Sequence, residues 1–235
     1  MKKIAIIQAR MSSVRLPGKV LELINGEPMI FWQLNRLTKS NKIQDFLVVT
    51  STDKSDDQLY DYLSNLGVPT YRGSLNDVAN RFYNSVAGKD LDYFIRLTAD
   101  CPLVMPKLLD QMITDYEAHP TDYFSNILEL TYPDGLDIEF VRSSAFNRLV
   151  AMPLSIKEKE HVTLGLYSRP HIFSLRNYGA HTNLKDHRWT VDTADDLEFI
   201  RRIFNHFKGR ETEFTVDEII KAQTSDSALV RLMPR

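Results

Sequence analysis

Short runs of apolar residues alternate with segments whose apolar positions recur every three to four residues. The apolar runs, which favour β-strands, cover residues 4–7, 46–50, 68–71 and 92–97. The segments with helical spacing cover residues 28–37 and 56–66, and a third opens at residues 76–82. Strands that alternate with helices of this length predict a three-layer α/β fold around a mostly parallel sheet with right-handed crossovers.

The second half of the chain is patterned less regularly. Its helical spacing predicts helices over residues 106–117, 143–152, 156–166 and 195–207. Strand-like stretches cover residues 123–126, 136–141 and 172–175, and we expect the tail from Ser225 to be peripheral. No repeat and no clear linker divides the chain, so we predict a single domain over residues 1–235.

The composition is that of an ordinary globular protein, since 43% of the 235 residues are hydrophobic and 26% are charged. A net charge of −2 argues against a nucleic-acid binder, because such proteins usually carry a basic surplus. The single cysteine, Cys101, excludes an internal disulfide, fits a reducing cytoplasm and is expected only to pack. The apolar run near Met1 is too short for an export signal or a membrane span, so we expect a cytoplasmic protein without a membrane partner.

A basic loop follows the first predicted strand, at the edge of the sheet where α/β proteins bind ligands. Within residues 8–19 it carries the cations Arg10, Arg15 and Lys19, the hydroxyl donors Ser12 and Ser13, and Gly18. Cations crowded into one loop repel each other unless an anion lies among them, and a polyphosphate fits such a cluster. The loop therefore predicts a triphosphate site.

This loop is not a Walker loop, because the first glycine of that motif is absent and Val20 replaces the Ser or Thr that should follow the lysine. The alternative interpretation is a basic loop that is merely solvated. Because we expect the loop to be exposed, replacing Arg10 or Lys19 by alanine should lower turnover strongly while leaving the melting temperature nearly unchanged.

Two aspartates, Asp100 and Asp192, stand where predicted strands give way to turns. Hard carboxylate oxygens at such strand ends suit Mg²⁺, which often accompanies bound phosphates. The alternatives are a turn-capping role for Asp100 and a helix N-cap for Asp192, although Thr193 or Asp195 could cap that helix instead. Two adjacent carboxylates without a metal repel each other, which predicts a raised pKa for one of them.

Four blocks of the sequence resemble one enzyme family. They are residues 9–19 (ARMSSVRLPGK), 96–103 (RLTADCPL), 132–139 (YPDGLDIE) and 188–197 (RWTVDTADDL), in family order. The chain thereby resembles the sugar-acid cytidylyltransferases, which include the CMP-KDO and CMP-N-acylneuraminate synthetases. Within that family it is most similar to the branch of the spore coat polysaccharide biosynthesis protein SpsF.

The resemblance implies a nucleotide-diphospho-sugar transferase-like, Rossmann-like fold and an Mg²⁺-dependent activity. The family joins CMP from CTP to an acidic sugar, here a nonulosonic or ulosonic acid, for surface polysaccharide or glycan biosynthesis, and releases pyrophosphate. It also implies a homodimer in which residues 132–171 lend surface to the partner. The family's metal ligands correspond to Asp100 and Asp192, but the CMP-KDO branch has Gly-Asp-Glu-Pro around the first, so metal geometry does not carry over.

The remaining candidate residues divide by role. Arg10, Lys19 and Asp100 are the predicted catalytic residues. The predicted nucleotide-binding residues are Ala9, Arg10, Ser12, Ser13, Arg15, Lys19, Gly73 and Arg81. Asp137 and Glu139, two apart on a predicted strand and hence on one face, contact the substrate or form a plain polar sheet face. Glu160 and His161 resemble a motif of the SpsF branch that meets the acceptor sugar, whereas the alternative for His161 is a structural histidine.

Three rival functions remain open at this point. One is a nucleotidyltransferase for another acceptor, such as a sugar phosphate or a phosphorylated alcohol. Another is a GT-A glycosyltransferase, which needs an Asp-x-Asp metal motif, but Asp90 and Asp92 precede their predicted strand. The third is an anion-sensing subunit that has lost catalysis. Measuring pyrophosphate release from each nucleoside triphosphate separates these classes.

Overall fold

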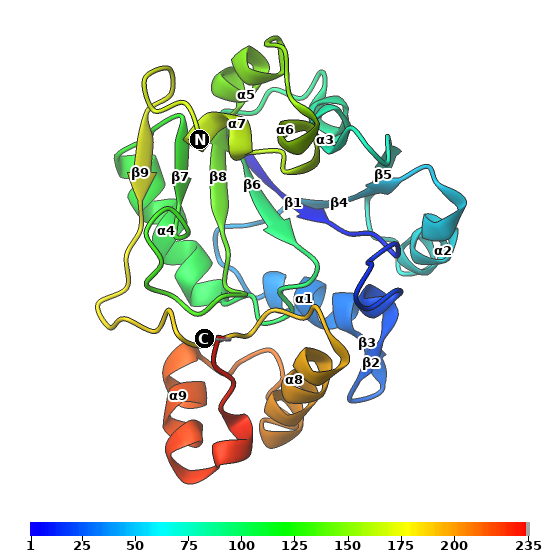
Figure 1. Ribbon diagram of the computed structural model, residues 1–235, viewed down its shortest axis with the longest axis vertical. Helices are drawn as coiled ribbons and strands as arrows, with labels where there is room; N and C mark the ends of the chain where they lie inside the picture. Colours follow the sequence, from blue (N-terminus) through cyan, green and yellow to red (C-terminus); the bar gives the residue numbers. More distant parts are fainter. Residues whose placement is uncertain (234–235) are drawn as a thin grey trace.

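A computed structural model describes residues 1–233 (Figure 1). Its centre is a seven-stranded sheet with the strand order β5-β4-β1-β6-β8-β7-β9. Strands β5, β4, β1 and β6 are mutually parallel, and β8 runs antiparallel to both of its neighbours. The strands are β1 Lys3–Gln8, β4 Phe46–Ser51, β5 Thr70–Gly73, β6 Tyr93–Thr98, β7 Tyr123–Ser125, β8 Glu139–Arg142 and β9 Leu175–Asn177. The sequence-based prediction of a mostly parallel α/β fold is confirmed.

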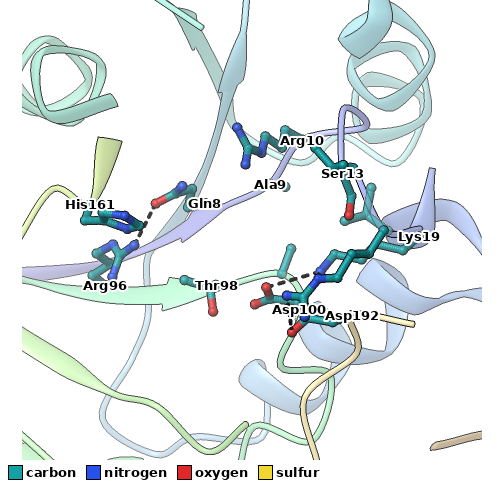
Figure 2. Close-up of a pocket in the computed structure, with 14 residues that line it drawn as sticks. Gln8, Ala9, Arg10, Ser13, Lys19, Arg96, Thr98, Asp100, His161 and Asp192 are labelled. Atoms are coloured by element: carbon teal, nitrogen blue, oxygen red, sulfur yellow. Dashed lines mark hydrogen bonds and ion pairs between the residues drawn. The ribbon is translucent and has the colours of Figure 1, made fainter. Parts of the chain in front are cut away.

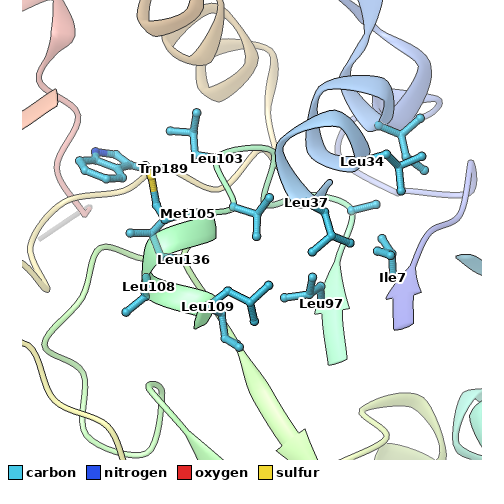
Figure 3. Close-up of a cluster of buried hydrophobic side chains, with 14 of the residues drawn as sticks. Ile7, Leu34, Leu37, Leu97, Leu103, Met105, Leu108, Leu109, Leu136 and Trp189 are labelled. Atoms are coloured by element: carbon cyan, nitrogen blue, oxygen red, sulfur yellow. The ribbon is translucent and has the colours of Figure 1, made fainter. Parts of the chain in front are cut away.

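Helices cover both faces of the sheet, which gives three layers (Figure 1). One apolar core joins the sheet to α1, α2, α4, α8 and α9, and Figure 3 shows part of it between α1, α4 and the strand ends. The second core joins the other face to α3, α5 and α7. The helices are α1 Met29–Leu37, α2 Asp57–Asn65, α3 Val78–Val86, α4 Pro106–Ala118, α5 Ser143–Val150, α6 Ile156–Glu160, α7 Leu164–Tyr167, α8 Ala194–His206 and α9 Val216–Ser225.

Alternation along the central strands explains why both faces are covered. On β1, Ala5 and Ile7 enter the first core, whereas Ile4 and Ile6 enter the second. All four side chains are at most 7% exposed, so the strand is buried on both sides. Because β1 lies between β4 and β6, its carboxyl end at Gln8 has a parallel strand on each side.

The structure differs from the predicted elements mainly in the second half of the chain. Strand β8 begins only at Glu139, so Asp137 does not lie on it. The helix predicted over residues 156–166 is broken into α6 and α7, because Val162 between them adopts a left-handed φ of 48° that a helix cannot contain. Strand β9 lies later than predicted, and α9 and the β2–β3 ribbon (Leu23–Ile24 and Glu27–Pro28) were not expected.

The carboxyl-terminal segment is not peripheral, contrary to expectation. After α9 the chain returns beside the segment that leads to Asp192, where the Arg188 N–H donates to the Arg231 carbonyl at 2.8 Å. The Met233 N–H donates to the Asp186 carbonyl at 2.7 Å. The same segment also bonds to Asp134, whose N–H donates to the His187 carbonyl at 3.0 Å. Within residues 1–233 no helix is both long and apolar enough to span a membrane.

Candidate active site

A cavity of about 420 Å³ opens at the carboxyl ends of β1 and β6 (Figure 2). Parallel strands bring their loops together at this edge, which is the usual ligand site of α/β sheets. The predicted residues that line it are Ala9, Arg10, Ser13, Arg15, Lys19, Asp100, His161 and Asp192. The structure thus gathers the basic loop and both predicted metal ligands around one cavity.

The basic loop is held in a fixed shape by backbone bonds and by one buried carboxylate. Gly18 adopts a φ of 75°, which favours glycine, and its N–H donates to the Met11 carbonyl at 2.8 Å. The fully buried Asp56 accepts from the Met11 N–H at 2.7 Å and from the Ser51 N–H at 3.0 Å. Asp56 therefore ties the loop to the end of β4, a role that the sequence did not reveal.

Lys19 lies between the two predicted metal ligands, as Figure 2 shows. Its Nζ is 3.2 Å from an Asp100 oxygen and 3.1 Å from an Asp192 oxygen, and it donates to the Val191 carbonyl at 2.6 Å. Lys19 is only 7% exposed. The expectation of an exposed lysine was therefore wrong, because the lysine reaches inward to neutralise the carboxylates that face it.

Asp192 is surrounded by cations. It forms ion pairs with Arg15 and with Arg188, each at 2.8 Å, in addition to Lys19. Burial acts to raise the pKa of Asp192, but the bonds from Lys19 and Arg188 outweigh it, so the pKa of this carboxyl lies below its ordinary value. The prediction of a raised pKa is thus wrong for Asp192. Its attraction to Lys19, Arg15 and Arg188 outweighs any repulsion from a neighbouring carboxylate.

Asp192 is not a helix N-cap. Thr193 fills that position for α8, since its hydroxyl accepts from the Asp196 N–H and the Asp196 carboxylate accepts from the Thr193 N–H. Asp196 in turn binds Arg231 at 2.7 Å, and that arginine belongs to the carboxyl-terminal segment. The helix cap and the chain terminus therefore hold the backbone beside Asp192.

The donor chemistry around Lys19 fits a divalent cation. Asp100 and Asp192 present two hard oxygen ligands to one point, because both are within hydrogen-bond distance of the same ammonium group. Within residues 1–233, no group of three His, Cys, Asp or Glu side chains is arranged as a metal site. Mg²⁺ commonly binds through one or two carboxylates and takes its other ligands from water and phosphates. The two aspartates suit that mode.

A second group of polar residues lies at the other end of the cavity. Gln8, Arg96 and His161 line it there, and Figure 2 shows them grouped away from Lys19. Neither Gln8 nor Arg96 was predicted to be functional. Arg96 lies inside the apolar run of β6, and only the paired structure reveals which face of the strand it occupies.

Glu139 lies behind this group and does not line the cavity. It is 3% exposed, forms an ion pair with Arg96, and accepts from the Tyr123 hydroxyl at 2.7 Å. The prediction that Glu139 contacts the substrate is therefore wrong. Glu139 instead supports Arg96, which does line the cavity. The structure also corrects Asp137, which is half-buried outside the cavity; burial, together with Asp134 and Glu139, raises its pKa to about 7.

The predicted nucleotide contacts Gly73 and Arg81 pack against each other. A Cβ on Gly73 would come within 2.8 Å of the Arg81 Cγ, so only glycine fits there. Arg81 is 1% exposed and donates to the Ser74 carbonyl at 2.9 Å. Burial lowers the pKa of Arg81 to about 10. Gly73 and Arg81 do not line the cavity, and neither do Ser12 and Glu160, which closes α6.

The sequence is similar to those of known cytidylyltransferases over most of its length. The family model described as cytidylyltransferase matches residues 4–223. The chain is 32% identical over 224 residues to the spore coat polysaccharide biosynthesis protein SpsF of Bacillus subtilis, covering 92% of this chain and 91% of that protein. It is 31% identical over 119 residues to the 8-amino-3,8-dideoxy-manno-octulosonate cytidylyltransferase of Shewanella baltica, covering 50% and 49% of the two chains.

A solved structure has nearly the same fold. It is a cytidylyltransferase from Leptospira borgpetersenii, with a TM-score of 0.93 and 27% identity, and the match covers 100% of this chain and 99% of that one. The similarity extends from the first strand to the carboxyl-terminal helices. The fold that carries the cavity is therefore the fold of a cytidylyltransferase throughout.

Proposed function

Because the chain belongs to the cytidylyltransferase family, we propose that it transfers CMP from CTP to a hydroxyl group of an acidic sugar and releases pyrophosphate. The acceptor class is a nonulosonic or ulosonic acid. One observation carries the proposal: a single cavity holds the loop cations at the end of β1 opposite Asp100 and Asp192. Nucleotidyl transfer requires cationic side chains that bind the triphosphate and carboxylates that bind the metal ion.

In the proposed reaction the acceptor oxygen attacks the α-phosphorus of CTP. A new oxygen–phosphorus bond forms as the bond to the bridging oxygen breaks, pyrophosphate leaves with that electron pair, and the hydroxyl proton passes to water. Arg10, Arg15 and Lys19 bind phosphate oxygens and stabilise the charge that develops on them. Asp100 and Asp192 would hold Mg²⁺, which supplies further charge neutralisation and acidifies the hydroxyl group.

Two facts favour an acidic sugar over the rival acceptors. A relative from Shewanella baltica is named for an octulosonate, which is a sugar acid. The end of the cavity opposite Lys19 also offers the side chains of Gln8 and His161, whose N–H groups can donate hydrogen bonds to an anion. The GT-A glycosyltransferase alternative receives no support, because Asp90 and Asp92 lie before β6, at the opposite end of that strand from Asp100.

The decisive experiment measures pyrophosphate. The protein is incubated with Mg²⁺ and each nucleoside triphosphate, together with a panel of ulosonic acids, nonulosonic acids, sugar phosphates and phosphorylated alcohols. We expect pyrophosphate release with CTP and an acidic sugar, loss of activity on chelation, and no activity in Asp100→Asn or Asp192→Asn. Turnover with a phosphorylated acceptor instead, or none with any acceptor, would reject the proposal.

A further inference from the structure

The cavity has two chemically different ends. Lys19, Asp100 and Asp192 occupy one end, and Gln8, Arg96 and His161 occupy the other (Figure 2). The first end accounts for phosphates and metal under the proposed function. The second end comes from three separate elements, namely the end of β1, the middle of β6 and the turn between α6 and α7. Its polar groups are therefore available to contact the acidic sugar of the proposed reaction.

Arg96 is fixed by a buried carboxylate. Its guanidinium forms an ion pair with Glu139, and the two side chains are 12% and 4% exposed. Glu139 also accepts from the Tyr123 hydroxyl at 2.7 Å and from the Thr163 hydroxyl at 2.5 Å. A carboxylate with three donors is satisfied and cannot turn, so it holds Arg96 in one orientation.

This arrangement determines which way the Gln8 amide points. The Arg96 guanidinium donates to the Gln8 side-chain oxygen at 2.9 Å, as the dashed line in Figure 2 shows. A guanidinium carries only donors, so the atom it contacts must be the amide oxygen and not the amide nitrogen. Arg96 therefore does not engage the Gln8 NH₂ group, which has no hydrogen-bond partner among residues 1–233, and Gln8 lines the cavity.

The same buried carboxylate also fixes the turn that carries His161. Thr163, whose hydroxyl binds Glu139, is two residues away, and Val162 between them has a φ of 48°. A β-branched residue in this left-handed region is strained, and such strain persists where the surroundings impose it, often at functional sites. Glu139 thus organises Arg96, and with it Gln8, together with the His161 turn.

We propose that this second end is the acceptor subsite, and that Gln8 is a specificity-determining residue whose NH₂ group donates a hydrogen bond to the carboxylate of the sugar acid. The inference rests on the proposed function and adds a residue and a role to it. Arg96 and Glu139 are positioning residues, because they act on the acceptor through the orientation of the Gln8 amide. The Gln8 NH₂ group can only donate, so the sugar atom that it binds must be able to accept a hydrogen bond. Both oxygens of an ionised sugar carboxylate can do so.

Three variants test this role. Gln8→Met keeps the side-chain length and removes the donor, whereas Gln8→Glu keeps an oxygen for Arg96 but presents a carboxylate to the cavity. Gln111→Met, on the exposed face of α4, controls for loss of an amide elsewhere. Steady-state KM values for CTP and for the acidic sugar are measured separately, with melting temperatures for each variant.

We expect Gln8→Met to raise the KM of the sugar acid roughly tenfold or more, because a hydrogen bond to a charged group is lost. Gln8→Glu should raise it further through charge repulsion. The KM of CTP should stay within about twofold, and Gln111→Met should match the parent. An unchanged sugar KM in either Gln8 variant, or an equal rise in the KM of CTP, overturns the inference alone. A parent protein without turnover on any sugar acid overturns the proposed function and the inference together.

Discussion

Replacing Lys19 by methionine should destabilise the protein as well as inactivate it. Methionine preserves most of the buried stem but removes the ammonium that contacts Asp100, Asp192 and the Val191 carbonyl. Removing one partner of a buried ion pair typically costs roughly 3–5 kcal/mol. Asp192 keeps Arg15 and Arg188, however, and the Asp100 side chain is 32% exposed and therefore partly solvated.

Those compensations reduce the expected loss in the free energy of unfolding to roughly 2–3 kcal/mol. For a chain of this length, each kcal/mol lowers the melting temperature by about 2–4 °C. The melting temperature of Lys19→Met should therefore fall by about 4–12 °C. Turnover should fall about a hundredfold to a thousandfold, as when other preorganised electrostatic groups are removed.

The assay combines differential scanning calorimetry with pyrophosphate release, and Arg10→Ala is the matched control. Arg10 lines the same cavity but forms no ion pair with any residue from 1 to 233, so its loss should reduce turnover without moving the melting temperature. In a double-mutant cycle, Lys19→Met with Asp192→Asn should destabilise less than the two single changes added together. A melting temperature of Lys19→Met within about 1 °C of the parent refutes the reasoning.

Three further predictions follow. Arg231→Ala should cost roughly 1 kcal/mol and lower the melting temperature, because the buried Asp196 loses one partner; an unchanged calorimetric transition contradicts this. Burial raises the pKa of Asp137 to about 7, so the folded state binds more protons than the unfolded state between about pH 4 and 7, and stability falls as pH rises. Asp137→Asn should therefore raise the melting temperature more at pH 8 than at pH 5, and equal shifts would contradict the raised pKa. The proposed homodimer should sediment at twice the mass of one chain in analytical ultracentrifugation, whereas a concentration-independent monomer rejects it.

The first half of the fold could be predicted because its signals are local. The apolar run of β1 is buried on both faces, so composition alone identifies it. Asp77 caps α3, as helix-start rules predict. The basic loop after β1 was correctly placed at the cavity, because the carboxyl end of a parallel strand is set by the strand itself.

The remaining features could not be predicted because their causes are distant in sequence. The break between α6 and α7 depends on Thr163 binding Glu139, 24 residues earlier. Arg96 interrupts an apolar strand and has no visible partner until β8 pairs with β6. The inward path of Lys19 depends on Asp192, 173 residues later. Each of these contacts joins polar or charged side chains that are far apart in the sequence, and such pairs leave no periodic pattern.

The charge pairing around Lys19 also implies that the proposed nucleotide and metal bind together. Phosphates can bind Lys19 and Arg15 only by competing with Asp100 and Asp192, which already hold these cations. Carboxylates that lose their cation partners gain affinity for another cation, so each ligand should increase the affinity for the other. CTP and Mg²⁺ added together should therefore raise the melting temperature by more than the sum of their separate shifts. This excess should vanish in Asp192→Asn, and strictly additive shifts in the parent protein would show that the carboxylates and the phosphates do not share Lys19.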